Sequence, residues 1–277
     1  MNPFALIGTI FNTFFLSPIV NLLVLILQLF NFLHIPGALG IGVILLTVII
    51  RLLVWPFMAA QMKSAKKMND LKPHLDRLKQ VHGKDQKAYA TAQMSLFKEH
   101  GYNPAAGCVP SLIQLPIIIA LYQAISSLFT PAEGLSHVNN LLYPFVPHLN
   151  KMPDIHFMGL LLSAKPSEFG KYGIVLLLVP IITAGLQFIQ SKMMSTAPVK
   201  NYPTDSSKEV KEKEKTGDTA SIMQGQMLYM MPLMIGFFSW QFPIGLALYW
   251  NTFTIFGIIQ QYKISGLGGL SQWLKKK

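Results

Sequence analysis

Long apolar runs constrain this chain more than any other feature. Five of them approach or exceed the roughly 20 residues with which an α-helix crosses a bilayer core. They are residues 38–58, 108–129, 172–192, 226–241 and 244–263. Backbone polar groups must be paired inside lipid, so such runs are expected to be helices. Because 51% of the residues are hydrophobic and only 13% are charged, we predict an all-α polytopic membrane protein with a five-helix transmembrane core.

The distribution of Lys and Arg predicts the orientation. If all five runs cross, one side holds nine of these residues in 59–107, six between Lys192 and 222, and four from Lys263 onward. The other side holds three, in the extracytoplasmic loop 130–171, for which the sequence suggests no function. Basic residues gather on the cytoplasmic side of bacterial plasma membrane proteins. The segments 59–107, 193–225 and 264–277, and with them the C-terminus, are therefore predicted to be cytoplasmic.

The N-terminal segment 1–37 allows two interpretations. Pro18 is expected to divide it into two pieces, each short for a span. Four polar residues recur at near-helical spacing and predict a narrow polar stripe: Ser17, Asn21, Gln28 and Asn31. This pattern favours a helix that lies at the outer membrane interface. The alternative is a sixth span, which would place the N-terminus inside.

The polar insert 59–107 is composed mostly of helix formers. Apolar residues suit one face of a first helix, His82-Gly83 breaks it, and a second apolar set follows. The first set is Met62, Leu71, Leu75, Leu78 and Val81, and the second is Tyr89, Met94, Leu96 and Phe97. Its basic residues include Lys63, Lys66, Lys67, Lys72 and Arg77. The insert is thus predicted to be a basic helical hairpin in the cytoplasm.

Arg51 is a permanent charge inside the apolar stretch VILLTVIIRLLVWPF. A charge near the bilayer centre costs at least about 2.5–3.5 kcal/mol. All twelve acidic residues fall in the connecting segments, so no carboxylate in a predicted span can pair with it. One interpretation is that Arg51 snorkels toward the headgroups, since Trp55 marks an interface about 6 Å away.

Glutamines on other runs favour a second interpretation of Arg51. Gln114, Gln187 and the pair Gln260-Gln261 lie at similar depth in the cytoplasmic half of their predicted spans. Unsatisfied amides are unfavourable in hydrocarbon, so a shared hydrated cavity open to the cytoplasm explains these residues together with Arg51. Separate interhelical hydrogen bonds with a snorkelling arginine remain the alternative.

The fourth run carries methionines at helical spacing: Met227, Met230, Met231 and Met234. Methionine makes adaptable apolar surfaces. Packing is the commoner reason for such a stripe. A surface along which hydrophobic substrate segments slide is the functional alternative.

The sequence contains no P-loop, metal-ligand cluster or catalytic triad. The single cysteine, Cys108, has no neighbouring histidine and is interpreted as a small packing residue. We therefore predict a protein that is not an enzyme and that uses no cofactor and no metal.

Several segments resemble the YidC/Oxa-type membrane protein insertases. VILLTVIIRLLVWPF is similar to the first core span of that family. Asn103-Pro104 followed by GCVPSLIQLPIIIALY is similar to the second span. MLYMMPLMIGFF and QFPIGLALYWNTFTIFGIIQQY resemble the last two. The order and spacing of these segments make the resemblance specific from about Pro18 onward.

The resemblance implies a five-helix core around a positively charged groove that is open to cytoplasm and lipid. Members insert small membrane proteins without nucleotide hydrolysis. Arg51 corresponds to the groove arginine, and Gln114, Gln187 and Trp250 are candidate groove residues. Implied partners are nascent membrane proteins, lipids, the Sec translocon, the ribosome and the signal recognition particle machinery, with no specific nucleic acid.

The chain departs from relatives in lacking a large extracytoplasmic domain, an N-terminal lipoprotein cysteine and a long basic tail. Two other functions stay open from the residues alone. One is an anion channel or solute transporter that uses Arg51 as its binding charge. The other is a structural assembly factor for which Arg51 is dispensable. A nucleic-acid binder is disfavoured because the basic residues flank membrane segments.

Overall fold

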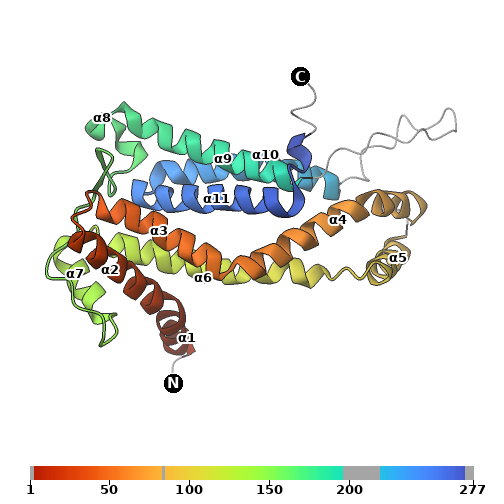
Figure 1. Ribbon diagram of the computed structural model, residues 1–277. Coiled ribbons are helices and arrows are strands. Elements are labelled where there is room, and N and C mark those ends of the chain that lie inside the picture. The colour runs from red at the N-terminus through yellow and green to blue at the C-terminus, as the bar shows by residue number, and fades with distance from the viewer. Residues whose placement is uncertain (1–2, 83–84, 196–218, 272–277) are drawn as a thin grey trace. The chain divides into compact units, whose positions relative to one another are not determined.

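A computed structural model describes residues 3–82, 85–195 and 219–271, and most of them are helical, which confirms the all-α class (Figure 1). The helices are α1 (Pro3–Phe11), η1 (Asn12–Leu16), α2 (Ser17–Phe32), α3 (Ala38–Leu53), α4 (Trp55–His82), α5 (Gln86–Glu99), α6 (Pro104–Ser127), α7 (Pro131–Asn140), η2 (Pro166–Glu168), α8 (Phe169–Tyr172), η3 (Ile174–Leu177), α9 (Leu178–Met194), α10 (Thr219–Gln241) and α11 (Ile244–Ser265). The strands β1 (His156–Phe157) and β2 (Leu160–Leu161) form a two-residue antiparallel hairpin.

The chain divides into two compact units, which we describe separately. The first comprises Met1–Trp55, Ser111–Leu186 and Ile235–Phe256. The second comprises Pro56–Pro110, Gln187–Met234 and Gly257–Lys277. Helices α6, α9, α10 and α11 each contribute residues to both units.

Length and composition identify candidate membrane spans among the described residues. Ala5–Phe32 and Ile174–Met194 are long and apolar enough to cross, and the pair α3 and α4, broken at Val54, makes a third if it is counted as one span. Ile174–Met194 coincides with the predicted span 172–192. The predicted runs 108–129, 226–241 and 244–263 fall largely on α6, α10 and α11, and their role as spans stays a prediction.

Pro18 does not divide the N-terminal segment as we expected. A π-helical turn, η1, precedes it, and the backbone N–H of Ser17 donates to the carbonyl of Asn12. Proline lacks an N–H and crowds the preceding turn. The wider π-turn leaves room for the ring at the start of α2, so the chain stays helical from Pro3 to Phe32.

Two residues of the polar stripe of α2, Asn21 and Gln28, contact the segment 130–171. Asn21 is 3% exposed, and its Nδ2 donates to the carbonyl of Leu141 (2.8 Å) while its Oδ1 accepts from the N–H of Tyr143 (2.7 Å). Nε2 of Gln28 donates to the carbonyl of Pro147. Asn31, the last residue of the stripe, is exposed, as are the apolar residues Leu25 and Leu29. Contacts with protein thus account for Asn21 and Gln28, and whether this helix crosses the membrane or lies on it stays a prediction.

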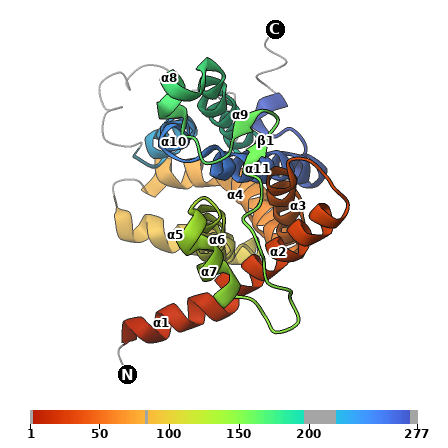
Figure 2. The ribbon, with the colours of Figure 1, turned by 90° about the vertical axis from the view of Figure 1, so that its left-hand side faces the viewer.

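The segment 130–171 covers one end of the first unit. Figure 2 shows β1 of this segment beside α3. The ring of Phe157 lies against Gly40 so closely that a Cβ there would come within 2.2 Å of it. The N–H groups of Ile244 and Gly245 at the start of α11 donate to the carbonyls of Ala164 (2.9 Å) and Leu162 (2.8 Å). The segment thus contacts the start of α3 through the Phe157 ring and the start of α11 through backbone hydrogen bonds.

Asp154 fixes the entry to the small hairpin. Its Oδ1 lies 3.0 Å from the backbone N–H of His156 and 2.7 Å from Nδ1 of the same residue. These hydrogen bonds favour the ionised carboxylate and lower the pKa of Asp154 below its ordinary value.

In the second unit, α4 and α5 pack against each other through Leu71, Leu75, Leu96 and Phe97. The carboxylate of Asp85 caps α5 by accepting from the N–H groups of Lys87 and Ala88. Val81 and Met94, expected on the apolar faces, are 74% and 52% exposed. They lie near the ends of the pair, where the facing helix offers less surface to pack against.

Candidate functional site

Arg51 lies buried in the first unit, and its side chain contacts α11. The residue is 1% exposed. Its Nη2 donates a 2.5 Å hydrogen bond to the carbonyl of Phe253, and its Cζ lies 3.4 Å from the centre of the Phe253 ring. Phe256 lies at the edge of this contact, with its ring centre 5.9 Å from Cζ. Arg51 is therefore held by an aromatic face and a carbonyl, and no described carboxylate pairs with it.

This environment offsets part of the cost of burying the charge. A desolvated cation over an aromatic ring gains about 2 kcal/mol or more. A hydrogen bond from a charged group contributes roughly 1.5–3 kcal/mol. The snorkelling interpretation is not what the structure shows, because snorkelling would place the guanidinium at the surface.

Gln114 lies in the same unit and contacts α11 one turn away. Its Nε2 donates to the hydroxyl oxygen of Tyr249 at 3.3 Å. Tyr249 is 1% exposed and lies beside Phe253, with ring centres 5.9 Å apart. A continuous row of contacts thus joins Gln114, Tyr249, Phe253 and Arg51.

Several buried polar atoms beside this row lack a hydrogen-bond partner among the described residues. They are Nε of Arg51, Oδ1 of Asn251 and Oγ1 of Thr254. An unsatisfied buried donor or acceptor costs about 1–3 kcal/mol. Such atoms favour water, or a polar group from another molecule, at this place.

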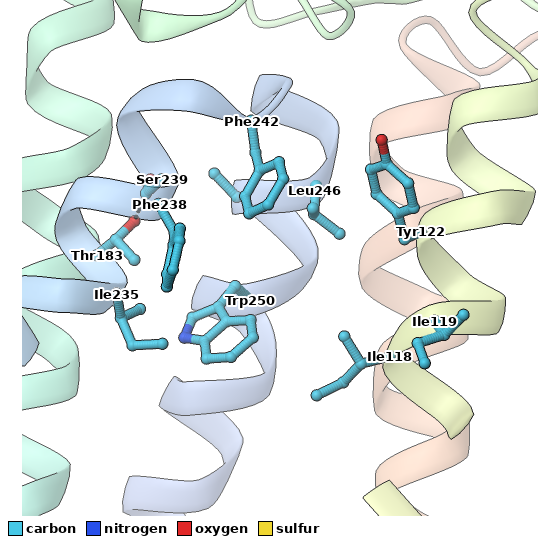
Figure 3. A pocket seen from close by; sticks show the side chains of 11 residues that line it. Ile118, Ile119, Tyr122, Thr183, Ile235, Phe238, Ser239, Phe242, Leu246 and Trp250 are labelled. Carbon is cyan, nitrogen blue, oxygen red and sulfur yellow. Dashed lines mark hydrogen bonds between the residues drawn. The ribbon is translucent and has the colours of Figure 1, made fainter. Parts of the chain in front are cut away.

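An apolar cavity of about 460 Å³ lies in the same unit. Figure 3 shows Ile118, Ile119 and Tyr122 of α6 on one side and residues of the α10–α11 hairpin on the other. Trp250 of α11 forms part of the wall. It is the helical neighbour of Tyr249, so one stretch of α11 borders both the Arg51 row and the cavity.

The walls of the cavity are aromatic and aliphatic. The ring centres of Tyr122 and Phe242 are 6.0 Å apart, and those of Phe238 and Phe242 are 6.2 Å apart. Its polar wall atoms include the hydroxyls of Thr183 and Ser239, which lie 3.3 Å from each other. A space lined in this way suits an apolar helix or acyl chain and offers little to a polar solute.

The structure places the other predicted site residues elsewhere. Gln187 belongs to the second unit. Met230, Met231 and Met234 are 61%, 41% and 48% exposed, and none of the three lines the cavity. The side chain of Met227 lies outside the described residues. The methionines that are described form exposed apolar surface on α10. Packing and contact with substrates both stay predictions for them.

The basic hairpin residues lie on α4. Lys63, Lys66, Lys67 and Arg77 are exposed, and Lys72 is half-buried. Nζ of Lys67 donates to the carbonyl of Gly101 at 2.9 Å, which ties the end of α5 to α4. The other exposed side chains leave a basic surface on this helix.

Sequence reasoning missed Phe253, Tyr249 and the aromatic wall of the cavity. The signal was available in YWNTFTIF, where Tyr249 and Phe253 are four residues apart and therefore share a helix face. The prediction takes only polar residues as partners for the charge and leaves aromatic rings out.

The described part of the chain contains no group of three or more His, Cys, Asp or Glu residues that could hold a metal ion. The side chain of Cys108 lies outside the described residues. The absence of a cofactor stays a prediction.

Comparison with known proteins identifies the family. The family model described as 60Kd inner membrane protein matches residues 30–267. Membrane protein insertase YidC 1 of Halalkalibacterium halodurans is 31% identical over 93% of this chain and 79% of its own length. Membrane protein insertase YidC of Fusobacterium nucleatum is 30% identical over 84% of this chain and 88% of its own length. Membrane protein insertase MisCA of Bacillus subtilis is 31% identical over 82% of this chain and 70% of its own length.

These matches bear on both the location and the activity of the chain. Together with the apolar helices they make it a multi-pass protein of the bacterial membrane. All three relatives are named membrane protein insertases, which supports the same general activity here. The chain belongs to the YidC/Oxa-type membrane protein insertase family.

Proposed function

We propose that this protein inserts membrane proteins by binding an acidic residue of the substrate at Arg51 and an apolar segment of the substrate in the cavity beside it. One observation carries the proposal. The buried guanidinium contacts Phe253 of α11, and Trp250 of the same helix lines the apolar cavity. A charge-binding point and an apolar slot next to each other match a polar tail followed by a hydrophobic segment.

The polar tail is the costly part of the substrate to move. Taking an ionised carboxylate into hydrocarbon without a partner is strongly unfavourable. At Arg51 the carboxylate would replace the Phe253 carbonyl as hydrogen-bond acceptor and would reach the unpartnered Nε. Water at the unpartnered atoms of Asn251 and Thr254 would solvate the tail as it passes.

The apolar segment supplies the driving force. Burying apolar surface gains about 25 cal/mol per Å², and a span has about 20 such residues. The segment would first occupy the cavity between α6 and the α10–α11 hairpin and would then enter lipid. This sequence of events needs no nucleotide.

The orientation of the chain and the role of its basic surface are proposed from the distribution of Lys and Arg. The basic segments 59–107 and 193–225 and the C-terminus would be cytoplasmic. The basic surface of α4 would receive substrates, or their targeting partners, before insertion. We include direct contact of this chain with the Sec translocon or the ribosome in the proposal.

Reconstitution tests the proposed function. Liposomes that contain the purified chain are expected to insert a small single-span protein with an acidic outer tail, and protease protection of the tail measures insertion. Liposomes without the chain give the background. If insertion does not exceed background while the same liposomes conduct anions, the transporter alternative replaces the proposal.

Hydration of the groove can be measured at Gln114. In a Cys108→Ser background, a cysteine at position 114 is expected to react with a water-soluble thiol reagent, because the side chain there is half-buried beside unpartnered polar atoms. Ala120→Cys is the matched control on the same helix, since Ala120 is 0% exposed. Equal protection of both cysteines would contradict a hydrated groove.

The apolar slot can be tested by crosslinking. A photoreactive amino acid at Ile119, which is 44% exposed and lines the cavity, is expected to crosslink to the hydrophobic segment of an inserting substrate. The same probe at Val81, exposed on α4 outside the cavity, controls for random encounter. Equal crosslinking at both positions would remove the slot from the mechanism.

A further inference from the structure

A second cavity, of about 280 Å³, lies in the second unit where α9 and α11 end. Its walls come from three elements: Lys66 and Asp70 of α4, Met193 and Ser195 at the end of α9, and Gln261 and Ser265 of α11. In contrast to the first cavity, charged and polar side chains line it.

The walls are held by specific contacts. Nδ2 of Asn69 donates to the carbonyl of Met194 at 3.0 Å, which ties α4 to the end of α9. The turn after α11 packs on α9 so closely that a Cβ at Gly268 would come within 2.0 Å of the Met193 carbonyl oxygen. The cavity is thus bounded by defined contacts between three elements.

The electrostatics at the base of the cavity favour a cation. The last turns of α9 and α11 both lie there, and the carbonyls at a helix C-terminus carry about half a negative charge. Asp70 adds a carboxylate. Oε1 of Gln261, on a side chain that is 5% exposed, and Oγ of Ser265 have no hydrogen-bond partner among the described residues. A buried amide oxygen accepts only, so it calls for a ligand with N–H or O–H donors.

A positive charge, on Lys66, lies one helical turn from the Asp70 carboxylate. Lys66 is exposed and precedes Asp70 by four residues on α4. Neither side chain forms an ion pair with another residue in the described part of the chain. Lys66 is therefore available to a phosphate next to a cation bound at Asp70 and Gln261.

The position of the cavity at the end of a candidate span indicates that such a ligand is a membrane lipid. Helix α9 completes the candidate span Ile174–Met194, and its last residues line the cavity. The end of a membrane span lies at the level of the lipid headgroups. A ligand with an ammonium and a phosphate a few ångströms apart is abundant there as phosphatidylethanolamine.

We propose that this cavity binds the phosphoethanolamine headgroup of a membrane lipid. The ammonium donates to Oε1 of Gln261 and to the Asp70 carboxylate, and the phosphate accepts from Lys66. A choline headgroup has the same charges but no N–H donor, and a glycerol headgroup has no cation, so both fit less well. The inference is independent of how substrates are inserted.

Calorimetric titration tests the site on the full chain in detergent. Short-chain phosphatidylethanolamine is expected to bind at least tenfold more tightly than short-chain phosphatidylcholine or phosphatidylglycerol. Gln261→Leu and Asp70→Asn are each expected to weaken this binding about tenfold. Asp76→Asn, at an exposed position of α4 outside the cavity, is the matched control for Asp70→Asn, and Lys87→Gln, at an exposed position of α5, is a second control; both are expected to bind as wild type does. Unchanged thermal unfolding of each variant separates lost binding from lost folding.

Several results would overturn the proposal. Equal binding of the choline and ethanolamine lipids, or wild-type binding by both cavity variants, would exclude recognition of the ammonium. Displacement of the lipid by inorganic phosphate alone would indicate an anion site only. If free phosphoethanolamine binds as tightly as the lipid, the ligand of this cavity is a soluble molecule and not a membrane lipid.

Discussion

Replacing Arg51 with alanine is expected to reduce insertion of an acid-tailed substrate by roughly ten- to a hundredfold. A hydrogen bond to a charged group contributes about 1.5–3 kcal/mol, and each 1.4 kcal/mol corresponds to a factor of ten. Arg51→Lys keeps the positive charge and is expected to retain much of the activity. The measurement is protease protection of the substrate tail in liposomes.

The substrate supplies the control for Arg51. A version of the same protein without acidic tail residues gains nothing from the guanidinium, so its insertion is expected to change much less in Arg51→Ala. An equal loss for both substrates would indicate that Arg51 acts through the packing of α3 on α11. An equal loss in the Lys and Ala variants would instead indicate that the planar geometry of the guanidinium matters.

Gly134→Ala is expected to cause a large loss of stability for a single added methyl group. A Cβ at this position would lie 1.8 Å from the backbone oxygen of Ser127 and 2.9 Å from its carbonyl carbon. No rotamer change relieves a clash with backbone, so α7 must move away from the end of α6. Overpacking of this kind costs about 1–3 kcal/mol, which corresponds to about 2–12 °C in Tm for a chain of this size.

Gly170→Ala is the matched control for Gly134. It lies in α8 of the same outer segment, and no heavy atom lies within 4 Å of the Cβ that the substitution adds. Thermal unfolding in detergent is expected to be unchanged for this variant. Similar midpoints for the two variants would show that the contact between Gly134 and Ser127 does not limit the stability of the protein.

Hydrophobicity predicted the fold class because lipid leaves few options for backbone polar groups. Long apolar runs must be helical, and these runs are largely helical in the structure. Pro18 shows the limit of this reasoning. A proline predicts a break in a regular α-helix, yet a π-turn precedes it and the chain stays helical, and no residue pattern in the sequence specifies that turn.

The site was only partly predictable for a similar reason. The sequence identified Arg51, because a charge in an apolar run is conspicuous, and Gln114 and Trp250. It did not identify Phe253, because which ring faces the guanidinium depends on the rotation of α11 relative to α3. It did not identify the contacts of Asn21 on α2, because its partners, Leu141 and Tyr143, lie about 120 residues away in the chain.

The outer segment has a mechanical consequence for access to Arg51. Backbone hydrogen bonds hold Ile244 and Gly245 at the start of α11, and Phe157 holds Gly40 near the start of α3. Arg51 lies near the other end of α3, and Phe253 lies about 14 Å along α11 from Ile244 at 1.5 Å per residue. A tilt of α11 by about 15° about its first residues would move Phe253 by about 3.5 Å at that helical rise. The contacts of the outer segment would hold the first residues of both helices in place during such a tilt, so the Arg51 guanidinium and the Phe253 carbonyl would separate at a distance from that segment.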